Sequence, residues 1–213
     1  MQMIIGIYGA SGFGREVLPL VHEQYPDAQL CFVDDGSKQN SLNSYTVYSY
    51  QDFLDLPQTN KAIIIAIANS KIREILEKKC LQDNLTILPV KASSSVILDE
   101  VNIGEGSVLC HFTHLTSNIK IGKYFHANIY SYVAHDCIIG DYVTFAPKVS
   151  CNGNVHIEDH AYIGTGAVLK QGTPDKPLVI GRGAIVGMGA VVTKDVAPGV
   201  IVIGNPAKIL ERK

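Results

Sequence analysis

The sequence predicts two consecutive domains: an α/β domain with a parallel sheet over residues 1–90, followed by a parallel β-helix over residues 91–213. The first half alternates short, almost wholly apolar segments with helical ones, which is the pattern of a parallel sheet covered on both faces. After Pro89 the pattern changes to a repeat of six residues. Repeats of this length are typical of parallel β-helices.

The N-terminal domain is expected to be Rossmann-like. Apolar segments predict strands at residues 3–8, 30–33, 61–68 and 85–88, and helices are predicted at 14–24 and from a cap at Asn69 or Ser70 to Cys80. Segment 36–60 is polar and weakly periodic, so we expect only connecting structure there. The domain is too short for the two halves of a dinucleotide-binding enzyme, so NAD is not expected as a cofactor.

The repeat of the second half has two inward-facing positions in every six residues. Aliphatic residues open the units from Ile97 to Leu169, except at Ala127, Phe145 and Cys151, and a small or β-branched residue usually stands four positions later. Three units complete one turn of a triangular prism, so one coil takes 18 residues. The eleven positions from 169 to 180 exceed one unit by five, which predicts a protruding loop within 171–179.

Composition excludes several classes of protein. The 213 residues carry 18 basic and 20 acidic side chains, so no basic field favours nucleic acid or an anionic membrane. Five scattered cysteines without a CxxC pair argue against a disulfide framework or a zinc ribbon. The apolar start is interpreted as a first strand, and no apolar run reaches the ~20 residues of a membrane span. We expect a cytoplasmic protein whose low charged fraction, 18%, favours self-association.

His135 is the strongest candidate for a general base among the seven histidines. One coil of 18 residues later stands Gly153, and stacked parallel strands lie about 4.8 Å apart. A histidine can take a proton near neutral pH, and a glycine N–H can stabilise negative charge that develops on a substrate oxygen. The alternative is that His135 is a solvated corner residue. By the same period the loop at 171–179 leaves this corner, so we expect it to border the active-site groove.

The other histidines raise the alternative of a zinc site. His111, His114 and His126 fall at three different places around an 18-residue coil, so they do not converge within one chain. We therefore interpret them as surface or interface residues, and no metal is expected.

A glycine turn precedes the first predicted helix. Gly9–Gly14 lacks the second glycine of a GxGxxG motif, but its N–H groups can still bind a diphosphate, with Ser11, Gly12 and Phe13 as candidate contacts. Asp34 and Asp35 follow the second strand. Their carboxylates can accept a hydrogen bond from N3–H of uracil or thymine, or alternatively cap an acidic turn.

The whole chain resembles the sugar O-/N-acetyltransferases, which include sialic acid O-acetyltransferases and bacillosamine- or viosamine-type N-acetyltransferases. The residues that carry the resemblance are Tyr8–Gly14, Val33–Asp35, Ala134–Cys137, Cys151–Val155 and Gly204–Lys208. The resemblance implies a left-handed coil, acetyl-CoA as co-substrate, and a homotrimer that binds CoA between neighbouring helices. It also implies acetylation of the 4-amino group of a dTDP- or UDP-linked 4-amino-4,6-dideoxy sugar, for bacterial surface polysaccharide.

The resemblance also implies roles for individual residues. Asp136 would orient His135, and Asn128 would lie near the acceptor amine or, alternatively, cap a turn. Gly153, Thr144 and Thr165 are the expected cofactor-binding residues, although some relatives carry a second histidine at position 144. Arg182 and Lys194 are interpreted as exposed cations of the last coils rather than partners of CoA phosphates.

Two other functions remain open from the sequence. A base and an oxyanion donor serve an O-acetyltransferase acting on sialic acid or another sugar hydroxyl as well as they serve an N-acetyltransferase. A non-catalytic nucleotide-binding scaffold is the alternative outside enzymes, and the alignment of His135 with Gly153 argues against it.

Overall fold

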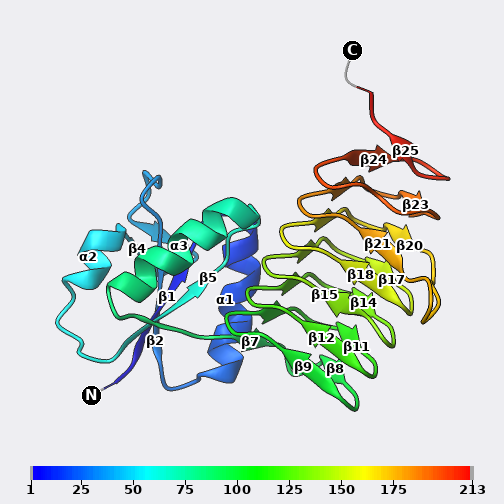
Figure 1. Cartoon of the computed structure of the whole chain (residues 1–213). Coiled ribbons are helices and arrows are strands. Elements are labelled where there is room, and N and C mark those ends of the chain that lie inside the picture. The colour runs from blue at the N-terminus through cyan, green and yellow to red at the C-terminus, as the bar shows by residue number, and fades with distance from the viewer. Residues whose placement is uncertain (1, 212–213) are drawn as a thin grey trace. The chain divides into compact units, whose positions relative to one another are not determined.

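The computed structural model describes residues 2–211 and divides into two compact units, Met1–Ser93 and Ser94–Lys213 (Figure 1). The first is an α/β unit and the second a parallel β-helix, so the predicted fold classes are present in the predicted order. The division falls three residues after the position suggested by the sequence. No helix within residues 2–211 is long and apolar enough to cross a bilayer.

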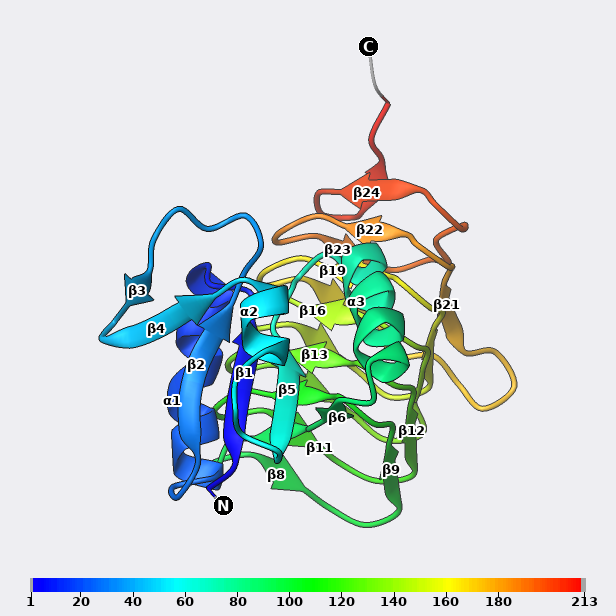
Figure 2. The ribbon, with the colours of Figure 1, turned by 90° about the vertical axis from the view of Figure 1, so that its left-hand side faces the viewer.

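The α/β unit contains a six-stranded sheet in the order β3-β4-β2-β1-β5-β6, in which only β3 is antiparallel to its neighbour. Its strands are β1 (Ile4–Tyr8), β2 (Gln29–Val33), β3 (Ser41–Leu42), β4 (Tyr45–Tyr48), β5 (Lys61–Ile65) and β6 (Thr86–Ile87), with β7 (Val90–Lys91) following. Its helices are α1 (Gly12–Gln24), α2 (Tyr50–Leu54) and α3 (Ser70–Gln82). In Figure 2, α1 lies behind the strands and α2 in front of them.

The expectation of mere connecting structure at 36–60 was wrong. This segment contains β3, β4 and α2, and Val47 of β4 pairs with Phe32 of β2. β4 is only four residues long, and Tyr45, Val47 and Tyr48 are half-buried. So short a segment has too few apolar positions to predict a strand, and its pairing with β2 is visible only in the structure. The largest differences at predicted ends are that β5 stops at Ile65 rather than at residue 68 and that α1 starts at Gly12 rather than at residue 14; the other ends shift by one or two residues. The predicted cap at Asn69 is confirmed, since its side chain accepts from Lys71 N–H and Ile72 N–H.

Three parallel sheets form the sides of the β-helix. One contains β10 (Val108–Leu109), β13 (His126–Ala127), β16 (Thr144–Phe145), β19 (Tyr162–Ile163), β22 (Ile185–Val186) and β24 (Ile201–Ile203), with antiparallel β25 (Lys208–Ile209). The next contains β8 (Val96–Ile97), β11 (His114–Leu115), β14 (Tyr132–Val133), β17 (Ser150–Cys151), β20 (Val168–Leu169) and β23 (Val191–Val192). The third contains β9 (Val101–Ile103), β12 (Ile119–Ile121), β15 (Ile138–Ile139), β18 (Val155–Ile157) and β21 (Leu178–Ile180).

The strand register follows the predicted period. Leu115 pairs with Val133, Val133 with Cys151 and Cys151 with Leu169, each 18 residues apart. Leu169 then pairs with Val192, a step of 23 that contains the predicted five-residue insertion. The inward residues of both predicted positions form one continuous buried core. All five cysteines are buried and free.

A left-handed backbone turn recurs at every sixth residue, which the sequence pattern did not reveal. The non-glycine residues with positive φ in the β-helix are Glu100, Phe112, Asn118, Tyr124, Tyr130, Asp136, Tyr142, Lys148, Asn154 and His160. Such a conformation costs an ordinary residue roughly 1–2 kcal/mol. The packed core and the coil-to-coil hydrogen bonds therefore have to outweigh a repeated backbone strain.

At one corner of the prism the backbones of stacked coils lie in direct contact. Gly104, Gly122 and Gly140 lie one coil apart, and a Cβ added to Gly122 would be 2.7 Å from the carbonyl carbon of Gly140. The Asp141 side chain fills the remaining space there, with Oδ1 accepting from Lys123 N–H at 2.9 Å. A methyl group at Gly122 would have to displace both the hydrogen-bonded Asp141 side chain and the backbone of Gly140 and Asp141.

We therefore expect Gly122→Ala to lower the free energy of unfolding by about 3 kcal/mol, the upper end of overpacking penalties. Gly189→Ala is the control, because Gly189 has φ of 66° but no heavy atom within 4 Å of an added Cβ. It should cost only about 1 kcal/mol of backbone strain. Denaturant unfolding of both variants measures the difference, and an equal or larger loss in Gly189→Ala would contradict the steric argument.

Candidate active site

His135 stands on the corner between β14 and β15. Its Nδ1 lies 2.7 Å from Oδ2 of Asp136, and both side chains are 47% exposed. Asp136 occupies the left-handed turn, with φ of 58°, which aspartate tolerates better than most residues. When Nδ1 donates to this carboxylate, Nε2 carries the lone pair and can accept a proton. An orienting role for Asp136, which the resemblance implies, requires a contact of this kind.

Gly153 lies directly against the imidazole, as the 18-residue period predicts. A Cβ added to Gly153 would be 2.5 Å from Nε2 of His135, so the ring occupies the space that any larger residue needs. Gly153 is buried, and its carbonyl accepts from Gly172 N–H at 3.0 Å. Within residues 2–211 no protein acceptor takes the Gly153 N–H. The Gly153 N–H is therefore available as a hydrogen-bond donor beside His135, the candidate base.

The other predicted residues of the β-helix do not join His135 within one chain. Asn128 follows β13 and Thr165 follows β19, so both lie at the corner between the first and second sheets. Asn128 Oδ1 accepts from Ile129 N–H at 2.7 Å, which is the turn-capping contact considered above. Thr144 precedes the core residue Phe145, faces outward on β16 and is buried.

The glycine turn of the α/β unit is tied to the end of β2 by Asp34. Its Oδ2 accepts from Ala10 N–H and its Oδ1 from Gly36 N–H, both at 2.9 Å. Ser11 is the N-cap of α1 but its side chain makes no capping hydrogen bond. Ser11 and Gly12 are exposed and Phe13 is half-buried. The turn is therefore open to a ligand while Asp34 holds its backbone.

Asp35 lies in a network that the sequence analysis missed. Tyr8 Oη donates to Oδ2 at 2.7 Å, Tyr50 N–H donates to Oδ1 at 2.8 Å, and Lys79 Nζ lies 3.5 Å from Oδ2. Partial burial alone would raise the pKa of Asp35, but these hydrogen bonds and the charge of Lys79 lower it below its usual value. Burial, with the Asp35 contact, raises the pKa of Tyr8. The carboxylate thus stays ionised and is half-exposed at the carboxyl edge of the sheet.

Of the three residues that contact Asp35, only Tyr8 could have been suspected from the sequence around it. It closes β1 immediately before the glycine turn, where ligand-binding residues of parallel sheets gather. Tyr50 and Lys79 belong to α2 and α3, and their distance from Asp35 along the chain hides the contact. Tyr50 also stacks on Tyr8, with ring centroids 5.5 Å apart, and Lys79 Nζ lies 3.8 Å from the Tyr50 ring centroid.

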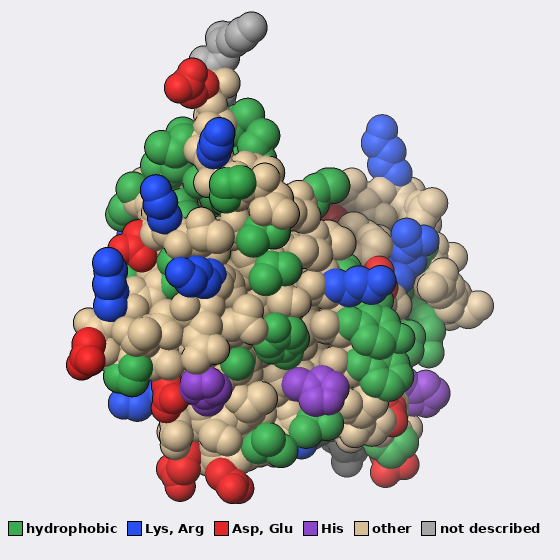
Figure 3. Space-filling model, turned by 90° about the vertical axis from the view of Figure 1, so that its right-hand side faces the viewer, with side chains coloured by type: hydrophobic (Ala, Val, Ile, Leu, Met, Phe, Trp, Pro, Cys, Tyr) green, Lys and Arg blue, Asp and Glu red, His purple; other side chains and the backbone are tan. Residues whose placement is uncertain are grey.

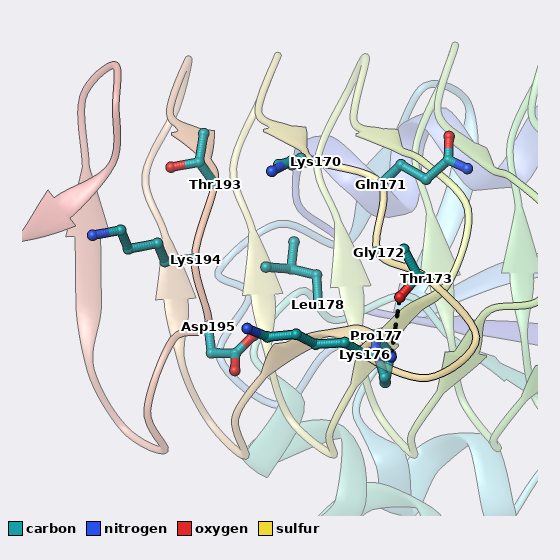
Figure 4. A pocket seen from close by; sticks show the side chains of 10 residues that line it. All are labelled: Lys170, Gln171, Gly172, Thr173, Lys176, Pro177, Leu178, Thr193, Lys194 and Asp195. Carbon is teal, nitrogen blue, oxygen red and sulfur yellow. Dashed lines mark hydrogen bonds between the residues drawn. The ribbon is translucent and has the colours of Figure 1, made fainter.

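A cavity of about 330 Å³ opens beside the inserted loop (Figure 4). Lys170, Lys176 and Lys194 line it together with Thr193 and Asp195. The hydrogen bond from Gly172 N–H to the Gly153 carbonyl fastens the loop to the corner of His135, so the predicted placement of the insertion on this corner is confirmed. Figure 3 shows further Lys and Arg side chains over the later coils, toward the C-terminal end.

The three histidines considered as zinc ligands have separate surroundings. His111 Nδ1 contacts Ser94 Oγ at 2.7 Å, His114 Nδ1 lies 3.2 Å from the Phe112 carbonyl oxygen, and His126 is buried on β13. In the described part of the chain no group of three or more His, Cys, Asp or Glu is placed to hold a metal ion.

Comparison with known proteins identifies relatives along the full length. Residues 4–80 match the PglD N-terminal domain family. The chain is 49% identical to GDP-perosamine N-acetyltransferase of Escherichia coli O157:H7 over 98% of this chain and 97% of the relative. The structure of WeeI from Acinetobacter baumannii AYE has 67% identity and a TM-score of 0.96, covering 98% of this chain and 100% of WeeI.

A more distant structure was solved with an acetyl donor bound. The acetyltransferase domain of PglB from Neisseria gonorrhoeae FA1090, solved with acetyl coenzyme A, has 26% identity and a TM-score of 0.88 over 99% of this chain and 100% of its own. The left-handed coil expected from the resemblance is the fold shared with these structures. The chain therefore belongs to the family of acetyl-CoA-dependent sugar N-acetyltransferases that join a PglD-type N-terminal domain to a left-handed β-helix.

Proposed function

We propose that this enzyme acetylates the 4-amino group of a nucleotide-linked 4-amino-4,6-dideoxy sugar that is used for a bacterial surface glycan. The observation that carries the proposal is the His135–Asp136 pair packed against Gly153. The sequence favoured dTDP or UDP as the nucleotide. A relative of 49% identity is named for GDP-perosamine, so GDP now stands first among the nucleotides.

The geometry supports direct transfer without a covalent enzyme intermediate. The sugar amine attacks the thioester carbon of acetyl-CoA while His135 Nε2 takes a proton from the amine. The carbonyl oxygen becomes negatively charged and accepts from the Gly153 N–H. Collapse of this intermediate breaks the carbon–sulfur bond, and the CoA thiolate takes the proton from the imidazolium. Asp136 keeps Nδ1 protonated throughout and stabilises the imidazolium.

The α/β unit is proposed to bind the nucleotide sugar. The open turn at Ser11, Gly12 and Phe13 offers N–H groups to the diphosphate, next to the start of α1. The ionised carboxylate of Asp35 can accept from a ring N–H of guanine, uracil or thymine. Asp34 acts on the site through the turn backbone, because both its oxygens accept backbone N–H groups.

The alternatives are weaker. A hydroxyl acceptor would suit the same base, but the family to which the chain belongs transfers acetyl to amines. A non-catalytic scaffold has no need of a glycine that makes room for an imidazole, nor of a carboxylate 2.7 Å from its Nδ1. Release of free CoA on mixing acetyl-CoA with the amino sugar separates the scaffold from the enzyme.

We expect the enzyme to be a homotrimer with shared active sites. Asn128, Thr144 and Thr165 lie on or beside the first sheet, whereas His135 lies on the corner between the second and third. A threefold arrangement of prisms can bring these two regions together from neighbouring copies. Multi-angle light scattering at micromolar concentration should give three times the mass of 23.1 kDa. A monomer under these conditions would refute the shared site.

The role of His135 is tested by His135→Ala, which should reduce kcat by ~10²–10⁴-fold with little change in nucleotide-sugar binding. Asp136→Asn should cost less, because it leaves the base in place and removes only the charged acceptor that holds Nδ1. His22→Ala, an exposed histidine of α1, is the control. A folded His135→Ala enzyme with near wild-type turnover would remove the mechanism.

The nucleotide is tested with matched GDP-, dTDP- and UDP-linked 4-amino-4,6-dideoxy sugars. We expect kcat/KM to be at least about tenfold higher with GDP, equivalent to about 1.4 kcal/mol of discrimination. The corresponding 4-hydroxy sugars should give no measurable turnover. Equal rates with all three nucleotides would show that the enzyme does not distinguish the nucleobases. Turnover of the hydroxy sugar would favour O-acetylation.

A further inference from the structure

The peptide bond between Asn152 and Gly153 turns its oxygen toward the interior of the β-helix. The thiol of Cys137, a completely buried residue, donates to the Asn152 carbonyl oxygen, with Sγ 3.2 Å from the oxygen. The peptide is trans, and in a trans peptide the N–H points opposite to the carbonyl. The Gly153 N–H therefore points away from the Cys137 sulfur and out of the core, on the corner that the His135 ring occupies.

This carbonyl lies outside the ladder of bonds between coils. On either side of it the ladder is intact, because the Cys151 carbonyl accepts from Ala134 N–H at 2.9 Å and Asn154 N–H donates to the His135 carbonyl at 3.0 Å. Within residues 2–211 no backbone N–H donates to the Asn152 carbonyl. A buried carbonyl without a donor is costly, and thiols fill the gap. The Cys151 sulfur is the more distant of the two, at 3.8 Å from the same oxygen.

The direction of this peptide depends on the thiol because the residues around it fix only one of its ends. The Asn152 side chain is anchored to both adjacent coils: Oδ1 accepts from Tyr132 Oη at 2.9 Å, and Nδ2 donates to the Leu169 carbonyl at 2.7 Å. Gly153 at the other end has no Cβ, so the peptide that precedes it can rotate at low steric cost. The hydrogen bond from Cys137 is the contact that opposes this rotation.

We propose that Cys137 is a positioning residue whose thiol holds the Asn152–Gly153 peptide so that the Gly153 N–H faces the oxygen of the reacting thioester. This rests on the proposed function, because it takes that N–H as the donor to the developing negative charge. A donor fixed in advance needs no reorganisation during the reaction, and a hydrogen bond to the carbonyl of a peptide strengthens its N–H as a donor. The same sulfur lies 3.6 Å from the His135 carbonyl oxygen, so it contacts the backbone on both sides of the site.

The test compares Cys137→Ala with Cys137→Ser, which differ by one hydroxyl, using acetyl-CoA and a GDP-linked 4-amino-4,6-dideoxy sugar. Cys137→Ala should lower kcat about tenfold, less than the ~10²–10³-fold typical for loss of a whole oxyanion donor. The KM for the nucleotide sugar should not change. Cys137→Ser should restore most of kcat, because its hydroxyl can donate to the same carbonyl. Val149→Ala, a completely buried residue at the equivalent inward position of another six-residue unit, is the control for lost core packing.

The outcomes separate a positioning role from a packing role. Equal kcat values in Cys137→Ala and Cys137→Ser, or a loss in Val149→Ala as large as in Cys137→Ala, would refute positioning while leaving the acetyltransferase intact. Should Cys137→Ala not fold, Cys137→Val takes its place, since it fills the space without donating a hydrogen bond.

Crystal structures of the variants test the peptide directly. The Asn152–Gly153 peptide should keep its direction in Cys137→Ser and turn in Cys137→Ala. An unturned peptide in Cys137→Ala would refute the proposal whatever the rate. If the wild-type enzyme acetylates no amino sugar, the proposed function fails, and this comparison still decides whether the thiol holds the peptide.

Discussion

The stacking of one coil on the next is the constraint on which the β-helix and its candidate site depend. Before the insertion each short strand pairs with the strand 18 residues away, and most backbone N–H groups of its strands bond to the next coil. A corner residue is therefore held directly beside its counterpart in the neighbouring coil. His135 lies against Gly153 for this reason, and any insertion that altered the register between them would separate the imidazole from the Gly153 backbone.

The same constraint imposes strain that is not special to the site. Asp136 adopts a left-handed conformation, yet so do Phe112, Tyr130 and Lys148 at other corners. The strained turn is thus a property of every six-residue unit, and the site uses it rather than creates it. What distinguishes this corner is the chemistry of its side chains: a carboxylate at the left-handed position turns back to the imidazole beside it. The hydrogen bond needs no support from distant residues.

The α/β unit is organised by a different principle. Its two acidic residues after β2 are engaged by groups from three other segments, and each plays a distinct part. Asp34 fixes the glycine turn through Ala10 N–H, whereas Asp35 is held by Tyr8, Tyr50 and Lys79 and keeps an exposed, ionised edge. Of these adjacent residues, Asp34 thus holds the backbone of the glycine turn, whereas Asp35 keeps a half-exposed carboxylate.

The sequence by itself determined the division into two folds, the 18-residue coil, the five-residue insertion and the alignment of His135 with Gly153. These follow from local periodicity, because each six-residue unit repeats the same short-range geometry. Only the tertiary structure decided the β3–β4–α2 segment, the Tyr8–Tyr50–Lys79 contacts of Asp35 and the lysine-lined cavity. Those features join residues from segments with no common period, so nothing in the local pattern of any one segment specifies its partners.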